Sequence, residues 1–455
     1  IAIILVFQII FPQQATLDNQ ELSVNEQIQP ATSIDENIST SSNKIQSKEE
    51  VINLSKRIDI ITPSLAGSIN LKGAILDDLI LLKYNEKLND NSKKISLFSP
   101  DGTSNPYYFE LGWKQLANEG FKIDLPNLET EWTSSQSNLT VDNPVTLSWQ
   151  NAQNITFKIV FEVDDNYLFN ISQIIENNNN SSIKVFPYRL VKRINLPNTI
   201  NFFILHEGLI SQLDGKLIEK KYDDLSDDCS SANSSKKLFC DQKSTGGWLG
   251  FTDKYWMATL IPDQNKPINA NYRHGNNGRD NFRVGYVGEV ANIQSKSSNI
   301  YFGQLFAGAK NLNVLNKYKN TGIPKFTDAI DWGWFSFLTK PISFSINWFY
   351  GYVENFGLAI IAFTILMRLI LFPLAQTSFK SMAKMKKLQP QMQELKETYP
   401  DDRQKMQQEL MALYKKEGAN PIAGCLPIVV QIPIFFSLYK VLFVTIEMRQ
   451  MPFYG

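Results

Sequence analysis

Arg368 lies inside an apolar run, residues 355–375, that otherwise has the length and composition of a membrane-spanning helix. An arginine guanidinium keeps its charge near neutral pH. Placing that charge in hydrocarbon costs at least about 2.5–3.5 kcal/mol on insertion scales, so an intramembrane arginine is by default a functional residue that faces protein or water. The chemistry it offers is non-covalent. The alternative is that the span ends earlier and leaves Arg368 at its boundary.

Residues that could form or break bonds are scarce. The chain has two histidines, His206 and His274, and no Cys/His cluster with the spacing of a metal site. No ATP-binding motif or catalytic triad is present, so we expect no catalytic residue, no metal and no cofactor. Cys229 and Cys240 flank a polar loop, and if this region is exported they are candidates for a disulfide; the sequence leaves open whether they are bonded. Cys425 lies in an apolar run and is expected to be a small buried hydrophobe.

The chain has 455 residues, which is enough for two or three domains, and a net charge of zero. Zero charge implies no bulk attraction to nucleic acid, and we expect no direct sequence-specific nucleic-acid binding. Residues 1–11 resemble the end of an N-terminal membrane anchor, and we expect the chain to be truncated at both ends. Residues 12–54 are polar and contain no aromatic side chain, which predicts a disordered linker.

Residues 55–325 have the alternating, β-branched texture of an antiparallel β domain, either a sandwich or a barrel. Runs that predict strands recur throughout this region, separated by Asn, Gly, Pro and Asp. They include residues 57–63, 155–164, 200–207 and 299–309.

Two further segments suit contact with a membrane. Residues 331–353 are aromatic and lightly charged, which predicts an amphipathic helix in the headgroup region; the alternative is a buried helix of the β domain. A second apolar run, residues 422–444, is long enough to cross a membrane. Lys440 lies near its far end, where its side chain is expected to snorkel outward. Residues 445–455 would then begin a periplasmic loop.

Residues 376–420, between the two apolar runs, predict an antiparallel helical hairpin. Two stretches carry apolar residues every three or four positions, and a Pro-Asp-Asp turn at 400–402 separates them. This segment holds nine Lys+Arg against six Asp+Glu. The positive-inside rule therefore places the hairpin in the cytoplasm and the β domain outside.

From about residue 345 the chain resembles the YidC-type membrane protein insertases of the YidC/Oxa/Alb superfamily. The matching residues are Met367-Arg368 with Phe372-Pro373-Leu374, the stretch 381–391, the stretch 411–436 with its prolines Pro427 and Pro433, and residues 447–453. Residues 246–263 also resemble part of the periplasmic domain of the Gram-negative members.

The resemblance implies a multi-domain membrane protein. Its parts would be an N-terminal anchor, a periplasmic antiparallel β-supersandwich, an interfacial helix, and an α-helical transmembrane core with a cytoplasmic helical hairpin. The family core has five spans, and this chain ends after the second of them. The implied location is the inner membrane of a Gram-negative cell, as a multi-pass protein with a large periplasmic domain. The implied function is not enzymatic: it is insertion and assisted folding of inner-membrane proteins, alone or with the Sec translocon.

The resemblance also implies a hydrophilic intramembrane groove that contains Arg368. Thr364 precedes Arg368 by four residues and so lies on the same helix face. Gln431, near the middle of the second run, would be the polar partner across the groove. Ile432 and Phe435 match the apolar face along which a client helix slides. Thr364 and Gln431 have an alternative structural role, which for Gln431 is helix–helix packing.

The hairpin is implied to recruit partners. The residues expected to do so are Lys384, Lys386, Lys387, Asp401 and Asp402, and the alternative is a solvated charged face. The implied partners are nascent membrane proteins, the ribosome, the lipid bilayer and, as an open question, the Sec translocon.

Two other classes of function are consistent with parts of the sequence. The β domain resembles sugar-binding supersandwich folds, so the chain could instead be a membrane-anchored carbohydrate-binding or carbohydrate-modifying protein. An enzyme of that kind needs a cleft with acid/base residues, for which His206-Glu207 and His274 are a thin basis. The third class is a purely structural assembly factor.

Overall fold

The computed structural model describes most of the chain after residue 44. The described residues are 45–88, 92–116, 122–200, 202–229, 240–276, 278–400, 402–418 and 421–453, and the side chains of 421–425 are not described. The predicted N-terminal anchor, the first part of the predicted linker, Asp401 and the side chain of Cys425 lie outside these residues.

The end of the predicted disordered linker, residues 45–54, contains a helix instead. Helix α2 (Lys48–Ile52) begins after Ser47, whose hydroxyl oxygen accepts the Glu50 N–H while the Glu50 carboxylate accepts the Ser47 N–H. This capping box satisfies two donors that a helix end leaves open. Lys48 Nζ also lies 2.6 Å from the Asp78 carboxylate. The amino-acid composition of this segment could not predict the helix, because the helix depends on a specific cap and on an ion pair with a distant residue.

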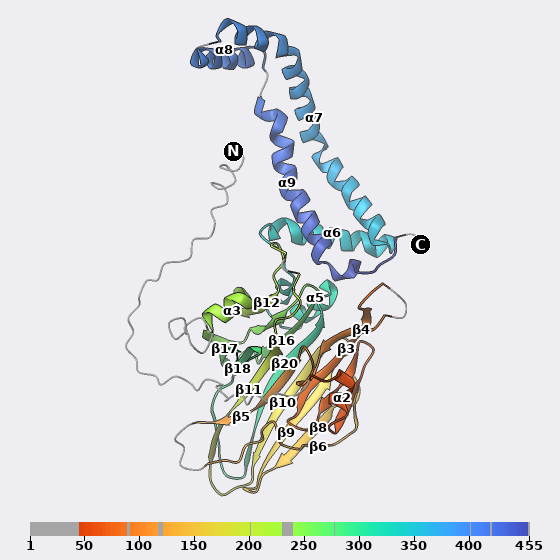
Figure 1. The fold of residues 1–455 in the computed structure, drawn as a ribbon, viewed down its shortest axis with the longest axis vertical. Coiled ribbons are helices and arrows are strands. Elements are labelled where there is room, and N and C mark those ends of the chain that lie inside the picture. The colour runs from red at the N-terminus through yellow and green to blue at the C-terminus, as the bar shows by residue number, and fades with distance from the viewer. Residues whose placement is uncertain are drawn as a thin grey trace, which may run out of the picture. The chain divides into compact units, whose positions relative to one another are not determined.

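Twenty strands in the described residues form two sheets, which are antiparallel apart from the pair β1–β7 (Figure 1). The first sheet has the order β14-β17-β18-β11-β5-β3-β2-β1-β7, with β19 beside β11 and β4 beside β3. The second has the order β13-β12-β15-β16-β20-β10-β9-β8-β6. The prediction of a sheet-rich N-terminal domain followed by a helical region is confirmed.

The strands of the first sheet are β1 (Arg57–Ile61), β2 (Leu65–Asn70), β3 (Ile75–Asn85), β4 (Lys94–Phe98), β5 (Tyr107–Gln115), β7 (Asn138–Leu139), β11 (Ile183–Ile194), β14 (Asp241–Thr245), β17 (Pro267–Asn276), β18 (Asp280–Val287) and β19 (Ala291–Ile293). Those of the second sheet are β6 (Thr133–Ser134), β8 (Val145–Gln150), β9 (Ile155–Val163), β10 (Leu168–Asn177), β12 (Gly208–Leu213), β13 (Lys216–Lys221), β15 (Trp248–Thr252), β16 (Trp256–Pro262) and β20 (Ser297–Ala309).

The two sheets pack through the apolar side chains that alternate along their strands. Along β9, every second residue from Ile155 to Val163 is buried, because successive side chains of a strand point to opposite faces. Phe157 of this row meets Trp113 of β5 edge to face, with ring centroids 5.1 Å apart. Full burial of one such aromatic side chain contributes about 1.5–3 kcal/mol. A core between the sheets follows directly from the alternation in the sequence.

Residues 200–207, for which the apolar pattern predicts a strand, form a loop instead wherever they are described. A turn in the loop is closed by the Leu205 N–H, which donates to the Phe202 carbonyl at 2.9 Å. The Ile204 carbonyl accepts a hydrogen bond from Lys440 of helix α9 (Pro421–Val444). The apolar residues here serve a contact with a helix, and a pattern of apolar residues does not distinguish that from a sheet.

One of the remaining helices, α3, lies between β13 and β14, and the others come after β20, the last strand. These helices are α3 (Tyr222–Asp228), α5 (Leu312–Asn320), the 3₁₀ helix η2 (Phe326–Ala329), α6 (Ser336–Val353), α7 (Phe356–Thr398), α8 (Arg403–Lys416) and the 3₁₀ helix η3 (Ile446–Met448). Helix α7 runs unbroken for 43 residues. The predicted span and the first arm of the predicted hairpin are therefore one helix. Within the described residues, two helical segments are long and apolar enough to cross a membrane, Phe356–Thr398 and Leu426–Val444.

Helix α8 packs back against the C-terminal end of α7 (Figure 1). Leu388 of α7 and Tyr414 of α8 are the buried centre of this contact, and Met385, Met392, Leu410 and Leu413 pack around them. The period of three to four residues in both stretches predicts these contacts, because it puts one apolar stripe on each helix.

Helix α6 has two different faces. Its buried side chains are Thr339, Ile342, Ser343 and Ile346, and its exposed aromatic side chains include Phe337, Phe344, Trp348 and Tyr352. The helix begins at Ser336, five residues later than the predicted start, because Asp331 to Phe335 form the link from the β domain. The aromatic face agrees with an amphipathic helix rather than with a buried helix of the β domain.

Candidate functional site

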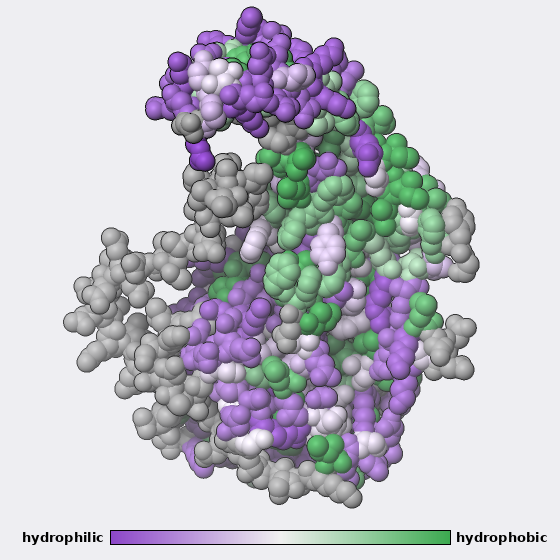
Figure 2. Space-filling view, turned by 45° about the horizontal axis from the view of Figure 1, so that its top comes forward, coloured by the Kyte–Doolittle hydropathy of each residue, from purple (hydrophilic) through white to green (hydrophobic). Residues whose placement is uncertain are grey.

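Helices α6, α7 and α9 meet in a small apolar cluster. Its buried members are Ile342, Ile346, Phe356, Ala359, Phe363 and Val441. Outside this cluster, α7 and α9 expose many large apolar side chains, among them Ile361, Ile365, Leu369, Ile370, Phe372, Ile428, Val429, Ile432 and Phe435. Figure 2 shows hydrophobic residues gathered over these helices and hydrophilic residues over the α7–α8 pair. An apolar surface that extends over two neighbouring helices marks a contact with a membrane or with a partner protein.

Arg368 lies on the exposed surface of α7. No group among the described residues forms a hydrogen bond or an ion pair with its guanidinium. Thr364, one turn earlier, is also exposed, but its hydroxyl donates to the Ile360 carbonyl at 2.7 Å. The Thr364 hydroxyl therefore has its hydrogen-bond partner within its own helix, whereas the Arg368 guanidinium has no partner among the described residues.

The other predicted groove residues lie on α9. Gln431 is half-buried, while Ile432 and Phe435 are 49% and 56% exposed. Helices α7 and α9 are neighbours, so the structure brings the two sets of residues onto adjacent helices. It forms no hydrogen bond between Gln431 and Arg368 in the part of the chain that it describes. The partnership of these two residues stays a prediction.

The described members of the predicted recruitment set differ in whether their side chains already have a partner within the protein. Lys386 and Lys387 are exposed, and Lys384 donates to the Gly418 carbonyl at 3.4 Å. Asp402 is the N-cap of α8, where its carboxylate accepts the Lys405 N–H at 2.9 Å. Asp402 thus has a structural role as the cap of α8. The sequence is consistent with this role, since an aspartate is a favoured residue immediately before a helix.

Lys440 is not directed outward, as the sequence predicts, but is 2% exposed. Its ammonium lies 2.6 Å from the Asp331 carboxylate and also donates to the Ile204 carbonyl. The same carboxylate oxygen of Asp331 accepts the backbone N–H of His206 at 2.8 Å. The snorkelling prediction is wrong because the β domain supplies an acidic partner at this level of α9.

Further contacts join the end of α9 to the β domain, and we call this region the junction. The Lys254 ammonium lies 3.6 Å from the centroid of the Phe443 ring. The Glu447 carboxylate accepts the Leu312 N–H at 2.6 Å, and Arg449 donates to the Glu86 carbonyl at 3.1 Å. The sequence contained one signal of the junction, a lysine in an apolar run. It did not indicate which residue pairs with Lys440, because Asp331 lies more than a hundred residues away in the chain.

Burial changes the acidity of two groups of the β domain near the junction. Desolvation lowers the pKa of His206 to about 4, although the hydrogen bond between its Nε2 and the Leu209 carbonyl at 2.7 Å favours the charged form. Desolvation also lowers the pKa of Lys310 to about 8, and its ammonium donates to the Thr252 hydroxyl at 2.9 Å. Both shifts reflect the cost of holding a charge where little water reaches.

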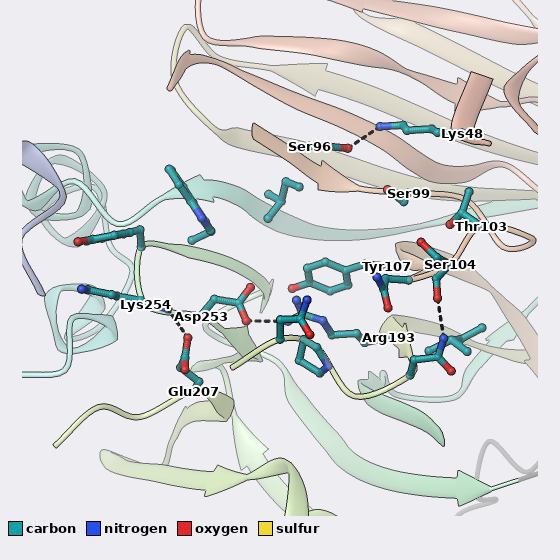
Figure 3. A pocket seen from close by; sticks show the side chains of 18 of the residues that line it. Lys48, Ser96, Ser99, Thr103, Ser104, Tyr107, Arg193, Glu207, Asp253 and Lys254 are labelled. Atoms are coloured by element: carbon teal, nitrogen blue, oxygen red, sulfur yellow. Dashed lines mark hydrogen bonds and ion pairs between the residues drawn. The ribbon is translucent and has the colours of Figure 1, made fainter. Parts of the chain in front are cut away.

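A cavity of about 590 Å³ lies in the β domain beside the β15–β16 turn (Figure 3). Figure 3 shows Arg193, Asp253 and Tyr107 close together in it, and Arg193 pairs with Asp253 at 2.8 Å. Glu207 accepts the Lys254 N–H at 3.3 Å. Lys48, which also lines the cavity, pairs with Asp78 outside it at 2.6 Å. These charged groups thus have partners within the protein, and neither histidine lines the cavity.

The remaining polar candidates are structural in their contacts. His274 lies 3.0 Å from the Asp280 carboxylate across the β17–β18 hairpin. The structure joins Cys229 to Cys240 by a disulfide, with Cα atoms 5.7 Å apart. Within the described residues, no group of three His, Cys, Asp or Glu side chains could hold a metal ion.

Solved structures resemble this chain only weakly. One is a galactose mutarotase related enzyme from Lactobacillus acidophilus, which is 7% identical, with a TM-score of 0.37 over 55% of this chain and 97% of that one. A likeness at that TM-score supports no inference about this protein.

Curated relatives are far more similar. One is 43% identical over 412 residues, which is 90% of this chain and 66% of the relative, and is named membrane protein insertase YidC of Methylorubrum extorquens. Another, with the same name, from Rickettsia conorii, is 42% identical over 452 residues, which is 98% of this chain and 76% of the relative. The chain spans about two thirds of the length of the first of these relatives.

Two family models together match nearly all of the described residues. The model described as the YidC periplasmic domain matches residues 57–345. The model described as the 60Kd inner membrane protein matches residues 348–455. The two matches meet inside α6, the helix that lies between the β domain and α7 in the chain. The resemblance seen in the sequence is therefore confirmed: this chain is an inner-membrane protein that belongs to the YidC family.

Proposed function

We propose that the chain acts as a membrane protein insertase, which inserts and helps fold inner-membrane proteins, alone or with the Sec translocon. The observation that supports this most is Arg368, a permanent charge on an exposed and otherwise apolar stretch of α7 with no partner among the described residues. Inside a membrane, such a charge needs water or an acidic partner. A client with an acidic exported segment supplies one.

The proposed topology places α7 and α9 across the inner membrane of a multi-pass protein. The β-supersandwich would then be periplasmic, and α8 with the last turns of α7 cytoplasmic. The basic charge of residues 376–420 supports this orientation. The disulfide between Cys229 and Cys240 agrees with an oxidising compartment for the β domain.

In this mechanism the protein lowers a barrier without making or breaking bonds. Arg368 keeps the groove hydrated and attracts the acidic segment of a client, and Gln431 contributes a second polar group. Ile432 and Phe435 offer an exposed apolar face along which the client helix enters lipid. Lowering the barrier by about 3 kcal/mol would speed insertion by about two orders of magnitude.

Recruitment of ribosome-bound clients is assigned to the basic face of the hairpin. Lys386 and Lys387 are exposed and carry this role. Asp402 contributes less to it, because its carboxylate is engaged at the helix cap. Nascent membrane proteins are the proposed substrates, and the ribosome and the Sec translocon are the proposed partners.

The experiment compares Arg368→Ala and Arg368→Lys in the intact protein reconstituted in liposomes, with a single-span client that has a short acidic exported tail. We expect the alanine variant to insert this client up to about two orders of magnitude more slowly and the lysine variant to retain most activity. Thr377→Val is the matched control, because Thr377 lies outside the predicted groove and its hydroxyl already donates to the Pro373 carbonyl within α7.

Undiminished insertion by Arg368→Ala would contradict the role of the charge. Photo-crosslinking from Phe435 separates client handling from scaffolding. An insertase should crosslink to the client helix during insertion, and a structural assembly factor should not.

A further inference from the structure

A second cavity, of about 380 Å³, lies at the junction. Its walls come from the loop before β12, one face of β13, the segment from Asp328 to the start of α6, and one side of α9. Its size is within the range of small-molecule sites in proteins. The proposed function of the membrane helices does not use this cavity.

Two charged groups of opposite sign line the cavity without a partner. Glu219 and Lys221 are two residues apart on β13, so their side chains lie on the same face of the strand. Neither the Glu219 carboxylate nor the Lys221 ammonium bonds to another side chain in the described part of the protein. An unpaired carboxylate beside an unpaired ammonium is suited to a ligand that carries both charges.

The other charges in the wall cancel one another. Lys440 pairs with Asp331 at 2.6 Å, and Lys340 pairs with Asp328 at 2.7 Å. The cavity as a whole therefore carries three ammonium groups and three carboxylates. A cavity without net charge gives an anionic ligand no general advantage.

The residues of α9 that line the cavity show at which level of the helix it lies. Lys440 and Phe436 line it and lie four and eight residues before the end of α9 at Val444, which is about 6 and 12 Å along the helix axis. The polar layer on one side of a bilayer is roughly 5–8 Å thick. If α9 spans the membrane, as the proposed function requires, the cavity lies at the boundary between headgroups and acyl chains.

Large aromatic side chains stand at the mouth of the cavity. Phe203 is 76% exposed and Trp334 is 86% exposed, and both line it. Exposed aromatic residues of this kind are favoured at a membrane–water interface. Their exposure is unexplained in water and expected if lipid covers them.

We propose that this cavity binds the headgroup of a zwitterionic phospholipid with a primary amine, phosphatidylethanolamine. The lipid ammonium donates hydrogen bonds to Glu219, and the lipid phosphate accepts from Lys221. The acyl chains follow the exposed apolar side of α9. A choline headgroup has no N–H to donate to Glu219, and an anionic glycerol headgroup has no ammonium.

The experiment measures lipid retention by the full chain. The chain is reconstituted in nanodiscs that contain equal amounts of phosphatidylethanolamine, phosphatidylcholine and phosphatidylglycerol, then released into mild detergent, and the retained lipids are counted by native mass spectrometry. We expect about tenfold more phosphatidylethanolamine than either other lipid, which corresponds to one charge-assisted hydrogen bond.

Two variants and a control on the same strand test the contacts. Glu219→Gln should abolish the preference for ethanolamine over choline, and Lys221→Gln should reduce retention of both. Lys216→Gln is the control, because Lys216 lies on the opposite face of β13 and does not line the cavity. It should retain lipid as the unchanged chain does.

Three results would overturn the proposal: equal retention of the three lipids, an unchanged preference in Glu219→Gln, or displacement of the lipid by micromolar phosphoethanolamine in solution. Protease protection of the same nanodiscs separates this inference from the proposed function. A chain with α7 and α9 across the bilayer and no retained phosphatidylethanolamine refutes the lipid site alone. A chain that does not cross the bilayer refutes the topology.

Discussion

Two cations lie in the two apolar runs of this sequence, residues 355–375 and 422–444, and they are used in opposite ways. Arg368 of α7 is exposed and has no described partner, whereas Lys440 of α9 is 2% exposed and pairs with Asp331. Sequence hydropathy treats both as a charge in an apolar run. The difference teaches that an intramembrane charge is a candidate for function only after the rest of the chain has failed to neutralise it.

The largest expected effect comes from breaking the pair of Lys440 with Asp331. Lys440→Met leaves a buried carboxylate without its counter-charge, which typically costs about 3–5 kcal/mol. The His206 N–H, which donates to this carboxylate, reports on the junction directly. We expect its hydrogen exchange to become at least 100-fold faster in nanodiscs, whereas Arg368→Met should leave that rate unchanged.

A double variant sharpens the same prediction. Lys440→Met with Asp331→Asn removes both charges but keeps an oxygen that accepts the His206 N–H. Exchange should return to within about tenfold of the unchanged chain, because removing a buried pair together often costs little. If the single and double variants exchange at the same rate, the ion pair is not what holds the junction.

The pH dependence of the junction is a smaller effect. Burial lowers the pKa of His206 to about 4 from an ordinary value of 6.5, so the unfolded chain binds its proton more tightly than the folded chain does. The stability that comes from neutral His206 is present above pH 6.5 and is lost as the pH falls towards 4. We expect it to amount to about 3 kcal/mol when the loss is complete.

His206→Gln isolates this contribution, because every other titrating group is common to both proteins. Thermal unfolding between pH 7 and pH 4.5 should show a steeper acid loss in the unchanged chain than in the variant. Parallel curves for the two proteins would mean that His206 becomes charged without cost, and that its burial is incomplete in solution.

Local regularities in the sequence predicted much of this fold. The alternation along β9 marks its buried face, and the three-to-four period around Leu388 marks the contact of α7 with α8. The two apolar runs predicted the two long helices. These features succeed because each depends on residues within one or two turns or strands of one another.

Contacts between distant segments could not be predicted in the same way. The apolar residues at 200–207 pack at the junction rather than in a sheet. The partner of Lys440 is Asp331, which precedes α6 and lies more than a hundred residues away in the chain. The order of residues 45–54 depends on Asp78 of β3. For the candidate groove, the sequence named Arg368 and its neighbours on α7 and α9, but how they act on a client stays a prediction.

The smallest effect concerns the hairpin, where the same contrast between engaged and open charges recurs. Asp402 is engaged as the N-cap of α8, whereas Lys386 and Lys387 are exposed. Asp402→Ala should destabilise α8 by about 1 kcal/mol, because the Lys405 N–H loses its acceptor. Lys386→Gln with Lys387→Gln should leave α8 intact and weaken ribosome binding. Hydrogen exchange of α8 and ribosome co-sedimentation measure the two effects separately. Loss of ribosome binding in Asp402→Ala with α8 still protected would give Asp402 a direct role in recruitment.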